Sequence, residues 1–236
     1  MKKWSDIARE VRRRLSSYPH YNDALAAANA LSTDYYFVGG KVFRTAAEIL
    51  YNVDCGAKDA DWDILSLDTA FDVLFILPGW NKTRGPGVAS FVSVSSYSVS
   101  GKGNFANPIK RSFRFERPAS IRIPKTKSAC IDLVAIEDVN ENDKTISAYF
   151  KAVPLDIQAI ALDPAGDFVS SPGLVALENK KVEWNNPSNH SQSYMDEKLK
   201  TLKGFTAAVT KGAKPRHKCT CDNRLLFTKG CQCGGY

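Results

Sequence analysis

Two carboxylates stand at alternate positions of a short apolar stretch, Asp61-Trp62-Asp63-Ile64-Leu65. Alternate residues of a β-strand point to the same face, so the stretch predicts that Asp61 and Asp63 project together, about 7 Å apart along the strand. Paired carboxylates are poor core residues and good ligands for Mg²⁺. The pair Gly39-Gly40 lies shortly before them, where a phosphate could approach the backbone closely. Together these residues indicate metal-dependent nucleotidyl transfer.

A third carboxylate lies in a later apolar run, at Asp132 of Cys130-Ile131-Asp132-Leu133-Val134. An ionised aspartate among apolar strand residues is costly unless it is paired or bound to a metal. We therefore expect Asp132 to complete the metal site, with a structural ion pair as the alternative. The register of the first pair also has an alternative, because Asp59 and Asp61 show the same spacing. The apolar residues that follow favour Asp61 with Asp63.

The chain has 236 residues, a formal net charge of +7 and an isoelectric point near 9.0. This basic balance favours a polyanionic partner such as RNA, and an ordinary basic surface is the alternative. The sequence has no apolar run long enough to span a membrane, and its basic first residues are not followed by an apolar signal segment. We therefore expect a cytoplasmic protein without a membrane partner, while the oligomeric state stays open.

Four of the six cysteines lie close together near the end of the chain, at Cys219, Cys221, Cys231 and Cys233. Four thiolates suit tetrahedral Zn²⁺, so we expect a structural zinc ion in a basic tail at 213–236. Disulfides and free thiols are the alternatives, although cytosolic thiols stay reduced. The lysines and arginines around these cysteines would let a folded tail bind RNA phosphates.

Short apolar runs and helical spacing predict the elements that must position these residues. We expect strands over 35–38, 62–65, 111–117 and 129–136. We expect helices near the N-terminus and over 45–51, 152–162 and 192–210. The mixture of strands and helices predicts an α/β (α+β) fold with a small mixed sheet and helices on one side.

Four blocks occur along the chain: VGGKV at 38–42, DWDILS at 61–66, LDIQAIALDP at 155–164 and YMDEKLKTLK at 194–203. In this order and spacing they resemble the GGxVRD, DIDIAT, RRDFTINALAYDP and EDPLRLLR blocks of class II tRNA CCA-adding enzymes and bacterial poly(A) polymerases. Those enzymes belong to the DNA polymerase β-like nucleotidyltransferase superfamily. The resemblance spans about residues 34–205 and implies a nucleotidyltransferase fold.

The resemblance also implies three groups of site residues. The metal ions, Mg²⁺ or Mn²⁺, would be held by Asp61, Asp63 and Asp132, the last of which would also help to deprotonate the acceptor hydroxyl. The phosphates would be gripped by Gly39, Gly40, Lys41 and Arg44. The nucleotide and its base would be contacted by Gln158, Asp196, Glu197 and Lys200. For Gln158 and Lys200, a polar residue that simply faces solvent is the alternative.

The implied reaction transfers a nucleoside monophosphate from an NTP to a hydroxyl and releases pyrophosphate, and the expected acceptor is an RNA 3′ end. Two alternatives stay open: transfer to a protein or small molecule, and a catalytically inactive nucleotidyltransferase fold that binds nucleic acid. Along the chain we expect N-terminal helices at 1–33, a head domain at 34–177, a helical neck at 178–212 and the zinc-binding tail at 213–236.

Overall fold

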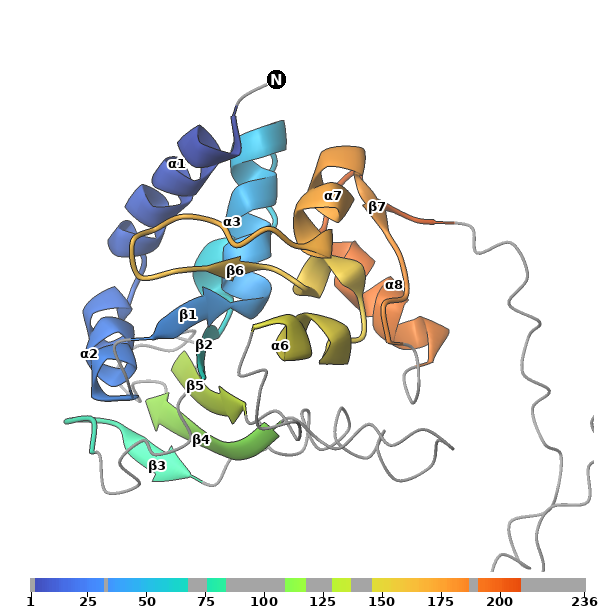
Figure 1. The fold of residues 1–236 in the computed structure, drawn as a ribbon. Coiled ribbons are helices and arrows are strands. Elements are labelled where there is room, and N and C mark those ends of the chain that lie inside the picture. The colour runs from blue at the N-terminus through green and yellow to red at the C-terminus, as the bar shows by residue number, and fades with distance from the viewer. Residues whose placement is uncertain are drawn as a thin grey trace, which may run out of the picture.

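Helices pack around one six-stranded sheet in the computed structural model (Figure 1). The model describes residues 3–31, 34–67, 76–83, 109–117, 129–136, 146–186 and 191–208. Within these segments, no helix is both long enough and apolar enough to cross a membrane. The tail with Cys219, Cys221, Cys231 and Cys233 lies outside the described residues, so the zinc ion expected there stays a prediction.

The large sheet is mixed, as predicted. Its strands are β1 (Tyr35–Val38), β2 (Trp62–Ser66), β3 (Asn81–Thr83), β4 (Ile109–Arg117), β5 (Ala129–Ile136) and β6 (Ala161–Leu162). They lie in the order β3-β4-β5-β2-β1-β6. The pair β2–β5 is parallel, whereas β1–β2 and β4–β5 are antiparallel. A second, two-stranded sheet pairs β7 (Lys181–Val182) with β8 (Thr206–Ala207).

The described residues form six α-helices and two short 3₁₀ helices. The α-helices are α1 (Trp4–Ser17), α2 (Tyr21–Leu31), α3 (Gly39–Tyr51), α6 (Ser147–Ala152), α7 (Pro172–Asn179) and α8 (Gln192–Thr201). The 3₁₀ helices are η1 (Ala57–Asp59) and η2 (Asp156–Gln158).

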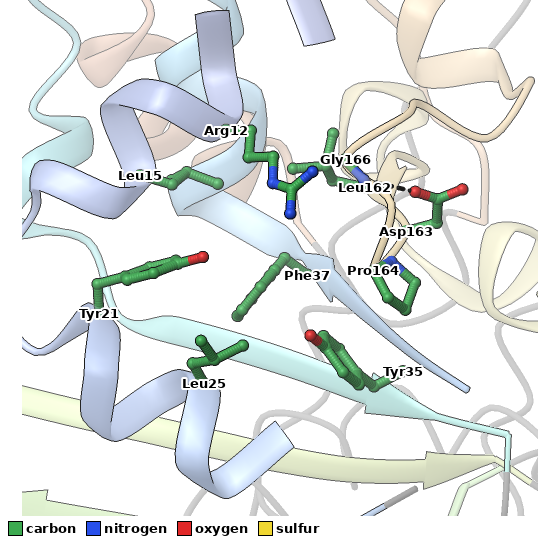
Figure 2. Close-up of a pocket in the computed structure, with 10 residues that line it drawn as sticks. All are labelled: Arg12, Leu15, Tyr21, Leu25, Tyr35, Phe37, Leu162, Asp163, Pro164 and Gly166. Carbon is green, nitrogen blue, oxygen red and sulfur yellow. Dashed lines mark hydrogen bonds between the residues drawn. The ribbon is translucent and has the colours of Figure 1, made fainter. Parts of the chain in front are cut away.

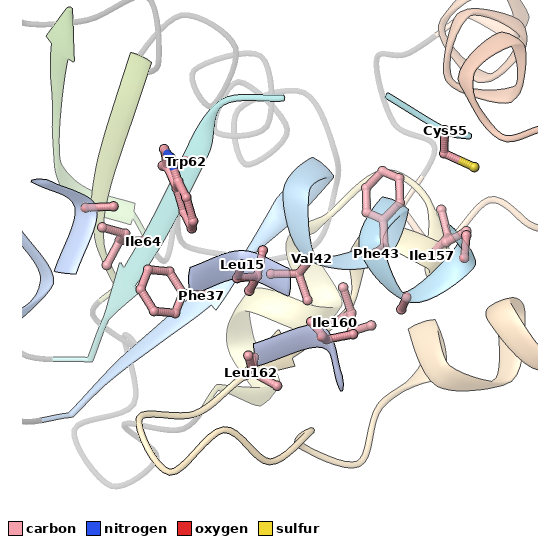
Figure 3. Packing of buried hydrophobic residues seen from close by; sticks show 14 of the residues in the cluster. Leu15, Phe37, Val42, Phe43, Cys55, Trp62, Ile64, Ile157, Ile160 and Leu162 are labelled. Carbon is pink, nitrogen blue, oxygen red and sulfur yellow. The ribbon is translucent and has the colours of Figure 1, made fainter. Parts of the chain in front are cut away.

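The main hydrophobic core lies between one face of the sheet and the helices α1, α2 and α3 (Figures 1 and 3). Alternate residues of the central strands reach this core, among them Phe37, Trp62 and Ile64. Burying side chains of this size contributes about 1.5–3 kcal/mol each. The indole of Trp62 also donates a hydrogen bond of 3.0 Å to the Pro19 carbonyl, which fixes β2 to the α1–α2 connection.

The other face of the sheet carries a second, smaller apolar cluster. Leu65 and Val134 point to this face and pack with Tyr149 and Phe150 of α6. Helices therefore lie on both faces, and the expectation of helices on one side only is wrong. Asp63 and Asp132 alternate with the residues of the main core, so they belong to the face that α6 partly covers.

The strands over 35–38, 62–65, 111–117 and 129–136 are confirmed, whereas three helices differ from prediction. The helix predicted over 45–51 already begins at Gly39, directly after β1. The helix predicted over 152–162 is wrong: α6 ends at Ala152, and η2 and β6 follow. Pro154 explains this ending, because proline disfavours a helical conformation in the residue before it. The helix predicted over 192–210 ends at Thr201, shortly before Gly204 adopts a positive φ of 82°.

Candidate functional site

A polar cavity of about 600 Å³ opens where β1 ends and β2 begins. One wall is the start of α3, and the floor carries carboxylates from the segment 59–63 and from β5. The opposite wall comes from α6, from the segment 153–158 and from α8. Segments that are distant in the sequence therefore converge on one cavity, which is the size of a small-molecule site.

A smaller cavity of about 80 Å³ lies between α1, α2 and β1 (Figure 2). Leu15, Leu25 and Phe37 line it, and Arg12 crosses beside it to donate a hydrogen bond to the Ala165 carbonyl. Its one carboxylate, Asp163, accepts a hydrogen bond from the Gly166 backbone N–H. This cavity holds none of the predicted site residues and is too small for a nucleotide.

The sheet brings the three predicted aspartates to the large cavity. Asp63 lies directly opposite Val38 on one side and opposite Asp132 on the other. Asp61 comes two residues earlier and also lines the cavity. The Asp61 side chain is 47% exposed and that of Asp132 only 7%. The carboxylates therefore range from half-open to buried along the cavity floor.

Crowding of negative charge is the main electrostatic property of this floor. Burial raises the pKa of Asp63 to about 8, with further contributions from Asp132 and Asp61 and an opposing hydrogen bond from the Gly40 backbone. The pKa of Asp61 is raised as well, first by burial and then by Asp132. A carboxyl group whose ionised form is disfavoured to this extent would gain from a bound cation.

Gly39 brings the start of α3 into contact with this floor. Its φ is +71°, and a Cβ built on it would clash with the Asp63 carboxylate. Two independent reasons therefore favour glycine at position 39: the positive φ, and the lack of space for a Cβ. A backbone hydrogen bond from Gly39 also reaches the hydroxyl of Tyr149, which is almost fully buried in the cavity wall.

Arg114 is one of the site residues that sequence reasoning missed. It lies on β4 directly opposite Asp132, and its Nε and Nη2 each donate a hydrogen bond of 2.7 Å to one oxygen of that carboxylate. Its Nη2 also lies 3.9 Å from Asp61. These contacts raise the pKa of Arg114. The ion-pair alternative for Asp132 is therefore realised, and the cross-strand register that creates it cannot be read from either strand alone.

The two cations predicted to hold phosphate are separated by the structure. Lys41 is only 2% exposed and does not line the cavity. Its amine donates hydrogen bonds to the carbonyls of Ala57 and Lys58 and lies over the ring of Trp62, 4.7 Å from the centroid. Burial lowers the pKa of Lys41 to about 8. This placement does not support the expected direct phosphate contact by Lys41, which stays an untested prediction.

Arg44, one turn further along α3, does line the cavity. Its Nε is buried and has no hydrogen-bond partner among the described residues. Burial lowers the pKa of Arg44, because the nearby negative groups offset only part of the cost of removing its positive charge from water. A buried donor without a partner is costly and would be satisfied by an anion.

Helix α8 reaches the cavity with a different face from the one predicted. Tyr194 and Lys198 line the cavity, whereas Asp196, Glu197 and Lys200 are exposed and do not. This placement does not support the expected role of those three residues at the base, which stays an untested prediction. Lys198 lies one turn after Tyr194, with its amine 5.1 Å from the tyrosine ring centroid.

Gln158 lines the cavity as predicted, and its orientation is fixed. Its Oε1 accepts a hydrogen bond from the Leu155 backbone N–H, and its Nε2 donates one of 2.9 Å to the Tyr194 hydroxyl. η2 and α8 are thus joined by a side-chain bond at the cavity wall.

No protein-family model, curated protein or solved structure matches this chain. The resemblance carried by the four sequence blocks therefore stays an expectation.

The metal-binding capacity of the floor depends on Asp132. Across the described segments, no three acidic, histidine or cysteine side chains are arranged to hold a metal ion. Both oxygens of Asp132 accept hydrogen bonds from Arg114. Asp61 and Asp63 flank the first residue of β2, whereas Asp59 lies on η1 at the cavity rim. Asp61 and Asp63 offer the carboxylate oxygens that a hard divalent cation prefers, and the metal ion expected there stays a prediction.

Proposed function

We propose that the protein is a metal-dependent nucleotidyltransferase that moves a nucleoside monophosphate from an NTP to a hydroxyl and releases pyrophosphate. One observation carries the proposal: the two carboxylates that flank the first residue of β2 share a cavity of about 600 Å³ with the N-terminus of α3. The cavity is large enough for a nucleotide, and its polar residues are of both signs.

Asp61 and Asp63 are the residues that would hold Mg²⁺ or Mn²⁺. Carboxylate oxygens are the preferred ligands of these ions, and the ionised form of Asp63, which burial and Asp132 disfavour, would be stabilised by a bound cation. A divalent cation at such a site lowers the pKa of the attacking hydroxyl and neutralises charge on the transferred phosphoryl group. Asp132 would join them when its ion pair with Arg114 opens.

The phosphates of the NTP would lie between the start of α3 and Arg44. A helix N-terminus favours anions through its dipole, and α3 is long enough for a full dipole. The buried Nε of Arg44 supplies a donor that needs a partner. Lys198 on the facing wall adds a second cation at the same cavity. The base would then lie near Gln158 and Tyr194.

The acceptor is proposed to be an RNA 3′ end, and the net charge of +7 supports a polyanion. Protein side chains and small molecules are the competing acceptors. Incubating the protein with each α-labelled NTP and Mn²⁺, in the presence of either RNA or a protein lysate, tells the acceptors apart. Label that enters only protein would refute the RNA assignment while leaving nucleotidyl transfer in place.

The decisive test removes the carboxylates of Asp61 and Asp63 together. In Asp61→Asn/Asp63→Asn, incorporation should fall by about a thousandfold or more, because a metal contributes several kcal/mol of transition-state stabilisation. Asp167→Asn serves as the matched control, because Asp167 is exposed and lies outside the cavity. Incorporation equal to that of the control, in a double variant with native circular dichroism, would remove these residues from the reaction.

A second candidate function is a catalytically inactive nucleotide-binding or nucleic-acid-binding protein. The bond between Arg114 and Asp132 favours it, because that contact replaces a metal ligand with an internal ion pair. This candidate predicts NTP binding that does not depend on Mn²⁺ and no incorporation with any acceptor. Isothermal titration of ATP with and without Mn²⁺ distinguishes it from the enzyme.

A further inference from the structure

We propose that Arg114 is an internal cation that competes with a divalent metal ion for Asp132. The proposal rests on the proposed function, because it concerns the metal site of that same cavity. It assigns to Arg114 a role in controlling when Asp132 becomes a ligand, rather than a role in holding the sheet together.

The geometry of the pair is that of a complete bidentate bond. Arg114 and Asp132 are directly opposed residues of antiparallel strands, and each carboxylate oxygen accepts one hydrogen bond of 2.7 Å. The two side chains are 17% and 7% exposed. Solvent therefore screens the pair little, and a metal ion can use Asp132 fully only by replacing the guanidinium.

The surroundings favour such an exchange. Asp61 and Asp63 line the same cavity as Asp132, and Asp63 lies directly opposite Asp132, so three carboxyl groups stand around one guanidinium. A divalent ion brings one more positive charge than the guanidinium and can be shared among all three carboxylates. Arg114 would then release Asp132 without leaving the site, since it lines the cavity and lies 3.9 Å from Asp61.

A displaced guanidinium would need a new partner, and the proposed substrate provides one. Arginine forms strong paired hydrogen bonds with phosphate oxygens as it does with carboxylates. The divalent metal ion would bind Asp132, while a phosphate of the NTP would accept the hydrogen bonds of Arg114. Binding of metal and binding of nucleotide are thereby coupled through one residue, and each promotes the other.

The test measures Mn²⁺ binding directly, by the decrease in free Mn²⁺ signal in electron paramagnetic resonance. Arg114→Gln removes the competing charge, so its affinity for Mn²⁺ without nucleotide should be about tenfold higher than that of the unmodified protein. Arg117→Gln is the matched control, because Arg117 lies on the same strand, is 52% exposed and pairs only loosely with Asp23 at 4.0 Å. Its Mn²⁺ affinity should be unchanged.

Two further variants keep the result interpretable. Arg114→Lys retains a charge without the planar fork and should give an intermediate affinity. In Arg114→Gln/Asp132→Asn both partners are neutral, so no unpaired Asp132 charge can destabilise the fold. The higher Mn²⁺ affinity expected for Arg114→Gln should be absent from this double variant. Thermal unfolding should show a larger rise in Tm with Mn²⁺ for Arg114→Gln than for the unmodified protein.

The outcomes separate this proposal from the proposed function. Equal or weaker Mn²⁺ binding by Arg114→Gln, with clear binding by the unmodified protein, overturns the role of Arg114 and leaves the metal site standing. A gain that persists when Asp132 is also replaced overturns the competition for Asp132. Absence of Mn²⁺ binding in every variant, with or without ATP, overturns both proposals.

Discussion

Replacing Gly39 with alanine tests how tightly the start of α3 is fitted to the carboxylate floor. The residue has a φ of +71°, and an added Cβ would collide with the Asp63 carboxylate. The left-handed backbone costs an alanine about 1–2 kcal/mol. Displacing a packed group costs about 1–3 kcal/mol more. We therefore expect Gly39→Ala to lower the free energy of unfolding by about 2–5 kcal/mol.

Gly56 offers a matched control for this substitution. Its φ is +68°, nearly the same, but among the described residues no atom beyond its chain neighbours lies within 4 Å of a Cβ built on it. Gly56→Ala should therefore cost only the backbone part, about 1–2 kcal/mol. The difference between the two variants measures the contact with Asp63, and urea denaturation followed by circular dichroism provides both values.

A double variant isolates the contact itself. In an Asp63→Ala background the carboxylate is gone, so Gly39→Ala should cost no more than Gly56→Ala does in the unmodified protein. A Gly39→Ala cost that matches Gly56→Ala in the unmodified protein, or that persists in the Asp63→Ala background, would refute the close approach of Gly39 to Asp63. The floor of the cavity would then have a different geometry from the one described.

Two further predictions concern the charges of the cavity. The pKa of Asp63 is about 8 in the folded protein, above the ordinary value of about 4, so between these pH values the folded protein holds a proton that the unfolded chain has released. The free energy of unfolding in metal-free buffer should therefore fall as the pH rises from about 4 to about 8. In Asp63→Asn this decrease should be smaller. Urea denaturation at a series of pH values measures both proteins, and parallel pH profiles would contradict the raised pKa of Asp63. On α8, Lys198→Gln should weaken ATP binding about tenfold, whereas Lys200→Gln, which changes a lysine outside the cavity, should alter it less than about twofold. Fluorescence titration with a labelled ATP analogue measures both affinities. Equal losses of ATP affinity in the two variants would contradict the orientation of α8 in which only Lys198 lines the cavity.

The central strands were predictable because local patterns determine them. Apolar runs around Asp61 and Asp132 predict β2 and β5, and the structure places both runs in strands at adjacent positions of the sheet. The Asp63–Asp132 neighbourhood follows from parallel pairing of these strands with the aspartates in register. Alternation within each strand then decides that both carboxylates face away from the main core.

The remaining features depend on distant contacts that no local pattern encodes. Lys41 has the residue type of a phosphate ligand, yet the packing of α3 on Trp62 turns its amine inward. The face of α8 that meets the cavity depends on the bond from Gln158 to Tyr194. The partner of Asp132 depends on the register of β4 against β5. Pro154 is a local signal for the end of α6, and it decides the structure here against the apolar spacing that predicts a helix over 152–162.

The buried amine of Lys41 gives the cavity a fixed electrostatic background. It lies near the rings of Tyr18 and Trp62, and the negative charges of Asp63, Asp61 and Asp59 act on it although it does not contact the cavity. Mobile ions in the buffer screen solvent-exposed charges strongly and buried ones weakly. Raising the ionic strength should therefore weaken the attraction between surface lysines and an anion in the cavity, while the attraction from Lys41 persists. An anion in this cavity would keep part of its stabilisation even in concentrated salt.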